Sequence, residues 1–472
     1  MQDRISEVQS DRITYSLAGG LQDHQIHHMH EKALQLAEEV GLQVTHDGVL
    51  KLLEGWSGVT IHGDRVHFSA ELMDECWRNW SCPYPPSPDW TMISGGMMLV
   101  VVDLKTGHTR HPTYQDLKDL ARLGDSYGMT CAPSVYPMDL PQPVWEIAMF
   151  KGLWENAEHT ISGLYEMVPR STIPSAECIY EMAQVVDKPF SLGLWIISPF
   201  KVDTSTLDII LRFLDRKVPL FVGTMPVTGL TAPISLVGAY LQSMAEVLAG
   251  FALLKLLSHG SPVFFGGKEV FRAYTADMKF AAQVFSSPED ILITLMQRDL
   301  NRFYGLPMVA KSLNTTSKEP DARAAVERAL HTMAAAMAGA RVFVNAGQLY
   351  NMSSAEQLVI DYEIVQQAKR VVEGFEFSEE ALAYDAICSV VQQGQDFLTH
   401  DMTLRNFRRL IWQPEAFDRT GINLWETDPV SFRQRVQKIA RKRIDTHQFH
   451  LERAVQEELD RIYDHHTRLM LA

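Results

Sequence analysis

Apolar runs and helix-like stretches alternate along the chain from residue 129 to residue 372. The apolar runs are mostly continuous rather than alternating, which is typical of parallel strands buried on both faces. The segments between them carry apolar residues at helical spacing. Seven strand-then-helix units are predicted: Met129–Tyr136 and Val144–Asn156, Thr160–Met167 and Ser175–Val186, Phe190–Ile197 and Thr206–Leu214, Leu220–Thr224 and Ile234–Leu257, Val263–Gly266 and Pro288–Phe303, Pro307–Leu313 and Pro320–Ala338, Arg341–Asn345 and Ala355–Val372.

Repeated strand–helix units form either an open doubly wound sheet or a closed barrel. The chain has no G-x-G-x-x-G and no G-x-x-x-x-G-K-[ST] segment, so the nucleotide-binding versions of the open sheet lack support. The pattern therefore favours an α/β fold with a TIM (β/α)8 barrel. Its eighth strand is either Met97–Asp103 or an unrecognised strand between Gly267 and Pro307.

Segments on either side of the barrel have a different pattern. Leu21–Val40 predicts a helix that ends at Gly41, and Val59–Ile61 with Arg65–Phe68 predict a hairpin. Helices are expected at Ser378–Gln393 and Pro429–Ala472. We expect three parts: an N-terminal α/β extension (1–115), the barrel (116–375) and C-terminal helices packed on it (376–472).

One apolar stretch, Ile234–Leu254, has the length of a membrane span. Gln242 and Glu246 lie near its middle, where an ionisable group is costly in lipid. A buried helix of the α/β fold is the better interpretation.

Net charge and cysteine content indicate which partners and which cellular compartment to expect. The chain has 472 residues and a net charge of −15, which argues against nucleic-acid binding. The basic run Arg433–Arg443 is interpreted as a solvated helix face or as a docking patch for an acidic protein. Five cysteines without a C-x-x-C pair, and a polar N-terminal segment, predict a cytoplasmic protein.

Motifs for metal or acyl chemistry are missing. His24, His27, His28 and His30 lie at the entrance to the first helix, but neither cysteine nor paired carboxylates accompany them. No H-E-x-x-H and no G-x-S-x-G occurs, so we expect no metal site and no serine hydrolase.

Residues at the predicted carboxyl ends of barrel strands are candidates for the site, because chemistry in a barrel lies there. Aromatic residues are frequent among them and carboxylates are scarce. Aromatic ring faces hold quaternary ammonium groups, although the same rings could simply cap the barrel core.

The segment Lys311–Ala340 joins a strand to an Ala-rich helix through a polar run. Pro320 and Asp321 fall in the expected first turn, and Gly339 would end the helix. Such a junction offers N–H groups and hydroxyls to a carboxylate, or it is an ordinary cap.

Three segments resemble the trimethylamine methyltransferase family. Leu21–Val44 resembles the family's opening helix, and Ser317–Ala340 resembles its D-A-K-x-P-D-x-Q-A-G helix. Phe397–Trp412 is similar to its H-T-L-R-x-F-R segment. The family implies a TIM barrel that moves a methyl group from a methylamine to the cobalt of a separate corrinoid protein.

Members that use trimethylamine carry pyrrolysine, whereas this chain runs through Lys311–Asp321 without such a residue. It thus resembles the branch without pyrrolysine, which implies a quaternary amine, with glycine betaine favoured and dimethylglycine as product. The corrinoid (cobalamin) would be carried by a partner protein, since the chain lacks D-x-H-x-x-G and binds no cofactor itself. A homo-oligomer is also expected.

Strand-end position and this resemblance together select ten candidate substrate-binding residues. Those expected to hold the ammonium group are Tyr136, Tyr165, Trp195, Phe200 and Phe265. Those expected to hold the carboxylate are Lys311, Asn314, Thr315, Asn345 and Gln348. Two alternatives stay open: the same reaction on another betaine (proline betaine or carnitine), and a barrel lyase or aldolase in which Lys311 forms a Schiff base.

Overall fold

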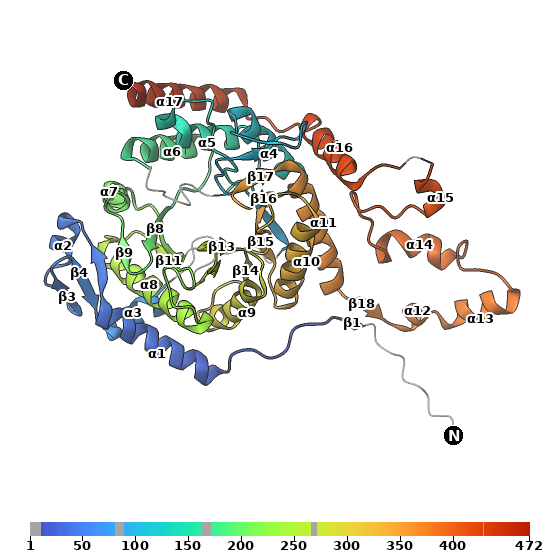
Figure 1. Ribbon diagram of the computed structural model, residues 1–472, viewed down its shortest axis with the longest axis horizontal. Helices are drawn as coiled ribbons and strands as arrows, with labels where there is room; N and C mark the ends of the chain where they lie inside the picture. Colours follow the sequence, from blue (N-terminus) through green and yellow to red (C-terminus); the bar gives the residue numbers. More distant parts are fainter. Residues whose placement is uncertain (1–10, 81–88, 162–170, 266–270, 428) are drawn as a thin grey trace.

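The computed structural model describes residues 11–80, 89–161, 171–265, 271–427 and 429–472, and Tyr165 lies outside this part. It is a mixed α/β structure in which helices surround a central group of strands (Figure 1). The N-terminal elements are β1 (Asp11–Ile13), α1 (Asp23–Val40), β2 (Leu42–Val44), α2 (Asp47–Leu53), β3 (Val59–His62), β4 (Arg65–Phe68), α3 (Ala70–Arg78), β5 (Thr91–Ser94), β6 (Val101–Val102) and β7 (Thr109–Arg110).

The central elements follow the predicted rhythm except near its start, where Met129–Tyr136 forms only isolated bridges and most of Thr160–Met167 lies outside the described residues. They are α4 (Tyr114–Ser126), η1 (Gln142–Val144), α5 (Trp145–Trp154), α6 (Ile173–Val185), β8 (Leu192–Ile197), β9 (Lys201–Val202), α7 (Thr204–Phe213), η2 (Leu214–Arg216), β10 (Leu220–Thr224), α8 (Leu236–Leu257), β11 (Val263–Phe265), β12 (Thr275–Asp277), β13 (Ala282–Val284), α9 (Pro288–Phe303), β14 (Val309–Ala310), α10 (Ala322–Met337), β15 (Val342–Ala346), β16 (Gln348–Leu349), β17 (Met352–Ser354) and α11 (Ala355–Val372).

The C-terminal elements form two groups. Residues 375–425 contain β18 (Phe375–Phe377), α12 (Glu379–Leu382), α13 (Tyr384–Gln393), α14 (Asp401–Leu410) and α15 (Ile422–Trp425). They are followed by α16 (Phe432–Asp445) and α17 (Arg453–Leu471), which pack on α4 and α11 and on α5 and α6, respectively. The helix predicted for 378–393 is interrupted at Ala383, which has a φ of 53°.

Parallel pairing links the central strands. β8, β10 and β11 are neighbours in one ladder, and β14, β15 and β5 are neighbours in another. Isolated parallel bridges join Ile93 of β5 to Thr130, and Cys131 to Thr160. All these pairings are parallel, as the continuous apolar runs predict.

The strand that pairs with β15 is β5, at Thr91–Ser94. The two locations expected for an additional strand contain other short strands. In the Met97–Asp103 segment, β6 covers Val101–Val102 and pairs with β7 and β17. Between Gly267 and Pro307, the described residues instead contain the antiparallel hairpin β12–β13. The strand β5 is only four residues long and follows a proline-rich segment, so its apolar pattern is too short to recognise.

Helix α8 is long and apolar enough to span a membrane, but 78% of its most apolar window is buried inside the protein. It packs against α1, α3 and β10. Its Glu246 is fully buried and accepts hydrogen bonds from the Ser198 hydroxyl (2.7 Å), the Thr224 hydroxyl and the Gln242 amide (2.8 Å). The interpretation of this segment as a buried helix agrees with the packing, because these partners compensate the buried carboxyl group.

Candidate functional site

A cavity of about 200 Å³ lies at the carboxyl ends of the central strands. Trp195 of β8, Lys311 after β14, and Asn345 of β15 all line it. Its other lining residues are Gly96, Met98, Met225, Tyr274, Gln283, Phe285, Val344, Gln348, Leu349 and Asn351. Four of the ten predicted residues (Trp195, Lys311, Asn345 and Gln348) therefore meet in one cavity, which we call the strand-end cavity.

Trp195 can occupy this position because the neighbouring strand carries a glycine opposite it. Gly223 of β10 pairs with Trp195 in the parallel ladder. A Cβ atom at position 223 would lie 2.9 Å from the Trp195 Cζ3 atom, closer than ordinary van der Waals contact. The glycine thus makes room for the indole ring beside the cavity.

Two aromatic residues of the cavity were not predicted. Tyr274 directly precedes β12 and Phe285 directly follows β13, so both come from the ends of the hairpin rather than from barrel strands. The Phe285 amide donates a hydrogen bond to the Thr316 hydroxyl (2.9 Å), which ties the hairpin to the loop after β14. The sequence signal for them is weak, because the turn at 278–281 has no short hairpin motif such as Asn-Gly.

Lys311 is the cation of the strand-end cavity. Its Nζ atom donates a hydrogen bond to the Tyr274 hydroxyl at 3.2 Å and lies 4.8 Å from the centroid of that ring. No Asp or Glu is among the residues that line this cavity in the described part of the chain. The described lining of the cavity therefore combines a positive charge with aromatic and amide groups.

Asn345 and Gln348 form an amide pair at the edge of the cavity. The Asn345 Nδ2 atom donates to Gln348 Oε1 at 3.2 Å, and Gln348 Nε2 donates to the Gly95 carbonyl oxygen. Asn345 has a φ of 73°, in the left-handed region that asparagine tolerates better than most residues. A Cβ atom at Gly96 would clash with the Gln348 amide, so this close approach requires a glycine.

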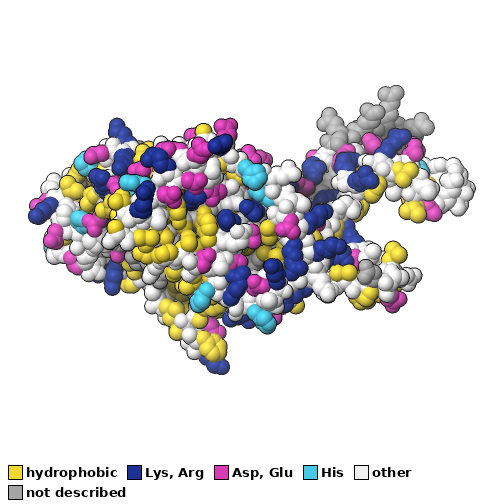
Figure 2. Space-filling view, turned by 90° about the horizontal axis from the view of Figure 1, so that it is seen from above, with side chains coloured by type: hydrophobic (Ala, Val, Ile, Leu, Met, Phe, Trp, Pro, Cys, Tyr) yellow, Lys and Arg dark blue, Asp and Glu magenta, His cyan; other side chains and the backbone are white. Residues whose placement is uncertain are grey.

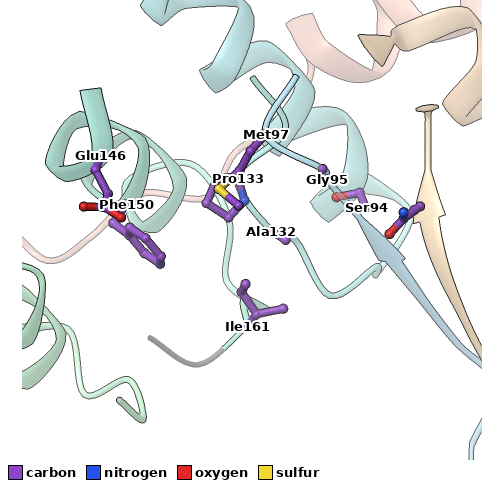
Figure 3. Close-up of a pocket in the computed structure, with 10 residues that line it drawn as sticks. Ser94, Gly95, Met97, Ala132, Pro133, Glu146, Phe150 and Ile161 are labelled. Atoms are coloured by element: carbon purple, nitrogen blue, oxygen red, sulfur yellow. The ribbon is translucent and has the colours of Figure 1, made fainter. Parts of the chain in front are cut away.

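A second, smaller cavity of about 30 Å³ adjoins the strand-end cavity, and Gly96 and Asn345 line both. Figure 3 shows Glu146 and Phe150 of α5 on one side of it, and Ser94 and Gly95 at the end of β5 on the other. Burial raises the pKa of Glu146, whose carboxyl group accepts hydrogen bonds from Ser171 and Ser175 at 2.5 Å each.

Tyr136 lies in a third cavity, of about 590 Å³, that shares Glu146 with the smaller one. Its ring is 5.7 Å from that of Trp145, centroid to centroid. The structure thus separates Tyr136 from the four residues that line the strand-end cavity.

The remaining predicted residues do not line the strand-end cavity. Phe265 is buried in the core and stacks on Phe251 of α8, with 4.3 Å between ring centroids. Phe200 is also buried, and its amide donates to Glu246 at 3.2 Å. Whether a residue near a strand end faces the barrel interior or the surrounding helices depends on side-chain direction, which the apolar pattern does not reveal.

The junction before α10 has the geometry of an ordinary helix cap. Asp321 is the N-cap, and its carboxylate accepts from the Ala324 amide and the Ser317 hydroxyl at 2.9 Å each. The Thr315 hydroxyl donates to Glu327, and the Asn314 carbonyl oxygen accepts from Ser286 at 2.8 Å. An acidic side chain thus already occupies the helix N-terminus, and Pro320 precedes the helix rather than beginning it.

The histidine cluster lies within α1, where His30 takes part in an aromatic contact between helices. His30 hydrogen-bonds through Nδ1 to the Tyr304 hydroxyl (2.6 Å) and through Nε2 to Asp74 (3.2 Å). Its ring also contacts those of Trp77 and Phe303. Among the described residues, no group of three or more His, Cys, Asp or Glu side chains is placed to hold a metal ion.

The basic run Arg433–Arg443 makes contacts within the chain. Arg433 of α16 pairs with the buried Glu356 of α11 at 2.8 Å. Arg443 pairs with Glu415 at 2.7 Å, and its guanidinium group lies 3.7 Å from the centroid of the Tyr127 ring. Several arginines of this run therefore attach α16 to the rest of the protein.

The structure is thus a mixed α/β protein with a cavity at its strand ends that is lined by aromatic side chains and a lysine. The model of the trimethylamine methyltransferase (MTTB) family matches residues 4–470, and the chain belongs to this family. The resemblance expected from three segments of the sequence is thereby confirmed.

Two relatives and one solved structure are similar to this chain. Glycine betaine methyltransferase of Desulfitobacterium hafniense (strain Y51) is 26% identical over 88% of this chain and 90% of its own length. Trimethylamine methyltransferase MttB of Methanosarcina thermophila is 34% identical, over 48% of this chain and 46% of its own length. The crystal structure of the Methanosarcina barkeri monomethylamine methyltransferase (MtmB) matches 91% of this chain and 88% of its own, at 8% identity and a TM-score of 0.47, too low to support an argument.

Proposed function

We propose that this protein is a methyltransferase that moves a methyl group from a quaternary amine, with glycine betaine favoured, to the Co(I) centre of a separate corrinoid protein. The observation that carries the proposal is the strand-end cavity, whose described lining residues include three aromatic rings and one lysine and no carboxylate. A quaternary ammonium group binds aromatic faces and cannot donate hydrogen bonds, so it gains little from a carboxylate partner. Membership of the family and the glycine betaine relative support the same conclusion.

We propose also that the parallel segments form a closed (β/α)8 barrel. Its strands would be β5, the segments at Thr130–Cys131 and Thr160, and then β8, β10, β11, β14 and β15. In this account, residues 116–375 supply most of the barrel, residues 1–115 form the extension that contributes β5, and residues 376–472 form the C-terminal part. A site at the carboxyl ends of the strands is the usual arrangement in such barrels.

Glycine betaine is a zwitterion, and the strand-end cavity offers a partner to each of its ends. The carboxylate would bind the Lys311 ammonium group, with the Asn345 and Gln348 amides beside it. The trimethylammonium group would lie against Trp195 and Phe285. Tyr274 is not assigned to the ammonium site, because Lys311 and Arg272 already lie near its ring.

The chemistry requires positioning rather than acid–base catalysis. The Co(I) lone pair attacks one methyl carbon, the C–N bond breaks, and its electron pair returns to nitrogen as the lone pair of dimethylglycine. Cobalt becomes methyl-Co(III), so the metal is formally oxidised by two electrons while the methyl group is transferred. Since the leaving group is a neutral amine, no proton donor is needed, and the cavity acts by orienting and desolvating the cation.

The corrinoid is a substrate carried by a partner protein in this proposal, and we propose no cofactor bound by the chain itself. The four cysteines within the described residues (Cys76, Cys131, Cys178 and Cys388) are free thiols. Free thiols support the proposal of a reducing, cytoplasmic compartment.

A substrate panel tests the proposed activity. The protein is mixed with Co(I) cobalamin and glycine betaine, proline betaine, carnitine or trimethylamine, and methylcobalamin formation is followed in the visible spectrum. Methylation from glycine betaine supports the proposal. Methylation from trimethylamine alone would contradict the quaternary-amine assignment, and methylation from another betaine alone would change the substrate but not the reaction.

Lys311 in the cavity also suits the lyase or aldolase alternative, in which its amine forms a Schiff base. Borohydride treatment in the presence of a carbonyl substrate would then add mass to Lys311. The methyltransferase proposal predicts that Lys311 stays unmodified.

A further inference from the structure

The segment formed by residues 375–425, here called the arm, projects from the rest of the protein except around Glu415 and Ala416, which contact α11 and α16. It contains β18 and α12 to α15. Figure 1 shows these elements extending to one side, away from the helices around the central strands, and Figure 2 shows the same side of the molecule drawn out from the main body. The strand β18 pairs with β1, and their close approach requires Gly374, where a Cβ atom would meet the Ile13 carbonyl group.

The arm exposes an unusual amount of apolar surface. It makes up roughly a tenth of the chain, yet it holds more than a third of the large apolar side chains that the described residues leave exposed. These residues are Phe375, Phe377, Leu382, Tyr384, Ile387, Val391, Phe397, Leu398, Leu404, Phe407, Leu410, Ile411, Ile422, Leu424 and Trp425. Scattered exposed hydrophobic residues are common, but a concentration of this kind marks an interaction surface.

The arm lacks a core of its own. α12, α14 and α15 contain no buried residue, and α13 contains one, Val390. The helices have 4 to 10 residues, shorter than the length at which isolated helices become stable in water. The two-stranded pairing of β1 with β18 is likewise marginal by itself. The arm therefore requires a surface that covers it as soon as the chain folds.

We propose that a second copy of this chain covers the arm, so that the arms of two copies pair with each other. The charges of the arm favour this occupant. α12 and α13 carry Glu379, Glu380 and Asp385 and no basic residue, whereas α14 carries Arg405, Arg408 and Arg409 with one acid, Asp401.

A two-fold axis between two arms places the acidic half of each arm opposite the basic half of the other. A groove of about 460 Å³ lies where the two halves meet, lined by Glu380, Tyr384, Met402 and Arg405 among others, and it offers space for side chains of the second copy. Pairing between copies supplies both the apolar cover and the opposite charges.

The nearest charges within one copy leave the arginines of α14 accessible to a second copy. Arg405 pairs with Asp401 at 3.0 Å on the solvent-exposed side of the helix, and Arg409 lies 3.8 Å from Glu376. Exposed pairs of this kind contribute little energy.

The first test measures the assembly of the full chain by analytical ultracentrifugation. We expect a dimer or a multiple of it at micromolar concentration, and the L404D/F407D variant should dissociate. The control V326D/L330D changes two residues of α10 with similar exposure, 57% and 61% against 58% and 42%, and should leave assembly unchanged. A monomeric wild-type chain, or equal assembly of both variants, would overturn the proposal.

The second test does not depend on how well the apolar variant folds. E380R/D385R and R408E/R409E should each weaken self-association, because like charges then face each other in both variants. Mixing the two should restore a heterodimer, because each altered half meets an altered partner of opposite charge. If mixing restores nothing while each variant remains folded by circular dichroism, the arm does not pair with itself, and a contact with the corrinoid protein becomes the occupant to examine.

Discussion

Trp195 is the residue whose position best connects the fold to the proposed substrate. It lies within β8, and Gly223 of the neighbouring strand β10 gives its ring room beside the strand-end cavity. The W195A variant should raise the KM for glycine betaine about tenfold or more and change kcat less, because a desolvated cation–ring contact contributes about 2 kcal/mol. Steady-state methylation of cobalamin measures both constants.

The matched control for this variant is W56A, which removes an exposed indole from the loop after α2. It should leave both constants unchanged. An unaltered KM in W195A would remove the tryptophan from the substrate site.

Strand-end position predicted Trp195, Lys311, Asn345 and Gln348 as neighbours, and the structure does bring them together. The sequence pattern could not identify Tyr274 and Phe285, because they come from a hairpin rather than from the ends of barrel strands. It also could not distinguish the rings that face a cavity from those that face the surrounding helices, as Phe265 does.

The buried His331 side chain is expected to make the free energy of unfolding depend on pH. It is fully buried between Ser286 (2.9 Å) and Thr294 (2.7 Å), and burial lowers its pKa to about 4 from 6.5. The unfolded chain therefore binds a proton at this site at a higher pH than the folded protein does. Stability contributed by the neutral ring is complete above pH 6.5 and is lost as the pH falls towards 4.

Urea unfolding at a series of pH values measures this loss, which should reach about 3 kcal/mol relative to the H331Q variant. The H28Q variant, which changes an exposed histidine of α1, should follow the wild type. Parallel pH profiles for wild type and H331Q would contradict the assignment.

At the scale of elements, Arg433 is one of the arginines that attach α16 to the rest of the protein. Its guanidinium group donates to Glu356 at 2.8 Å, and that carboxylate is 2% exposed. The R433A variant should lose about 2 kcal/mol of unfolding free energy, because it removes hydrogen bonds to a buried charge. Denaturant unfolding measures the difference.

The comparison for this variant is R453A, which breaks the exposed pair with Glu457 on α17. That change should cost less than about 0.5 kcal/mol. Equal losses in the two variants would show that the Arg433 contact does not hold α16 in place.

Elements with long periodic patterns were predictable, and short or irregular ones were not. The predicted bounds of α9, α11 and β10 match the structure, because each has a complete apolar pattern with a clear start. β5 has four residues and was missed. The segment expected to be a strand at Met129–Tyr136 forms only isolated bridges, at Thr130, Cys131 and Val135. The helix expected over 429–472 is two helices, α16 and α17.

At the scale of the whole molecule, the sequence supported one strand–helix rhythm with additions at both ends. The arm was expected to be helices packed on a barrel, but much of it stands clear of the central strands (Figure 1). The pattern of residues 378–410 is amphipathic in either case, and only the structure shows that many of its apolar side chains are exposed among the described residues. The proposed pairing of arms would provide the interface of the homo-oligomer that the sequence predicts.

The central claim is that the protein transfers a methyl group from glycine betaine to cobalt without the help of an acid. Glycine betaine with ¹³C in its N-methyl groups, mixed with the protein and Co(I) cobalamin, should give labelled dimethylglycine and ¹³C-methylcobalamin in a one-to-one ratio. Appearance of trimethylamine instead of dimethylglycine, or of labelled dimethylglycine without methylcobalamin, would contradict the account.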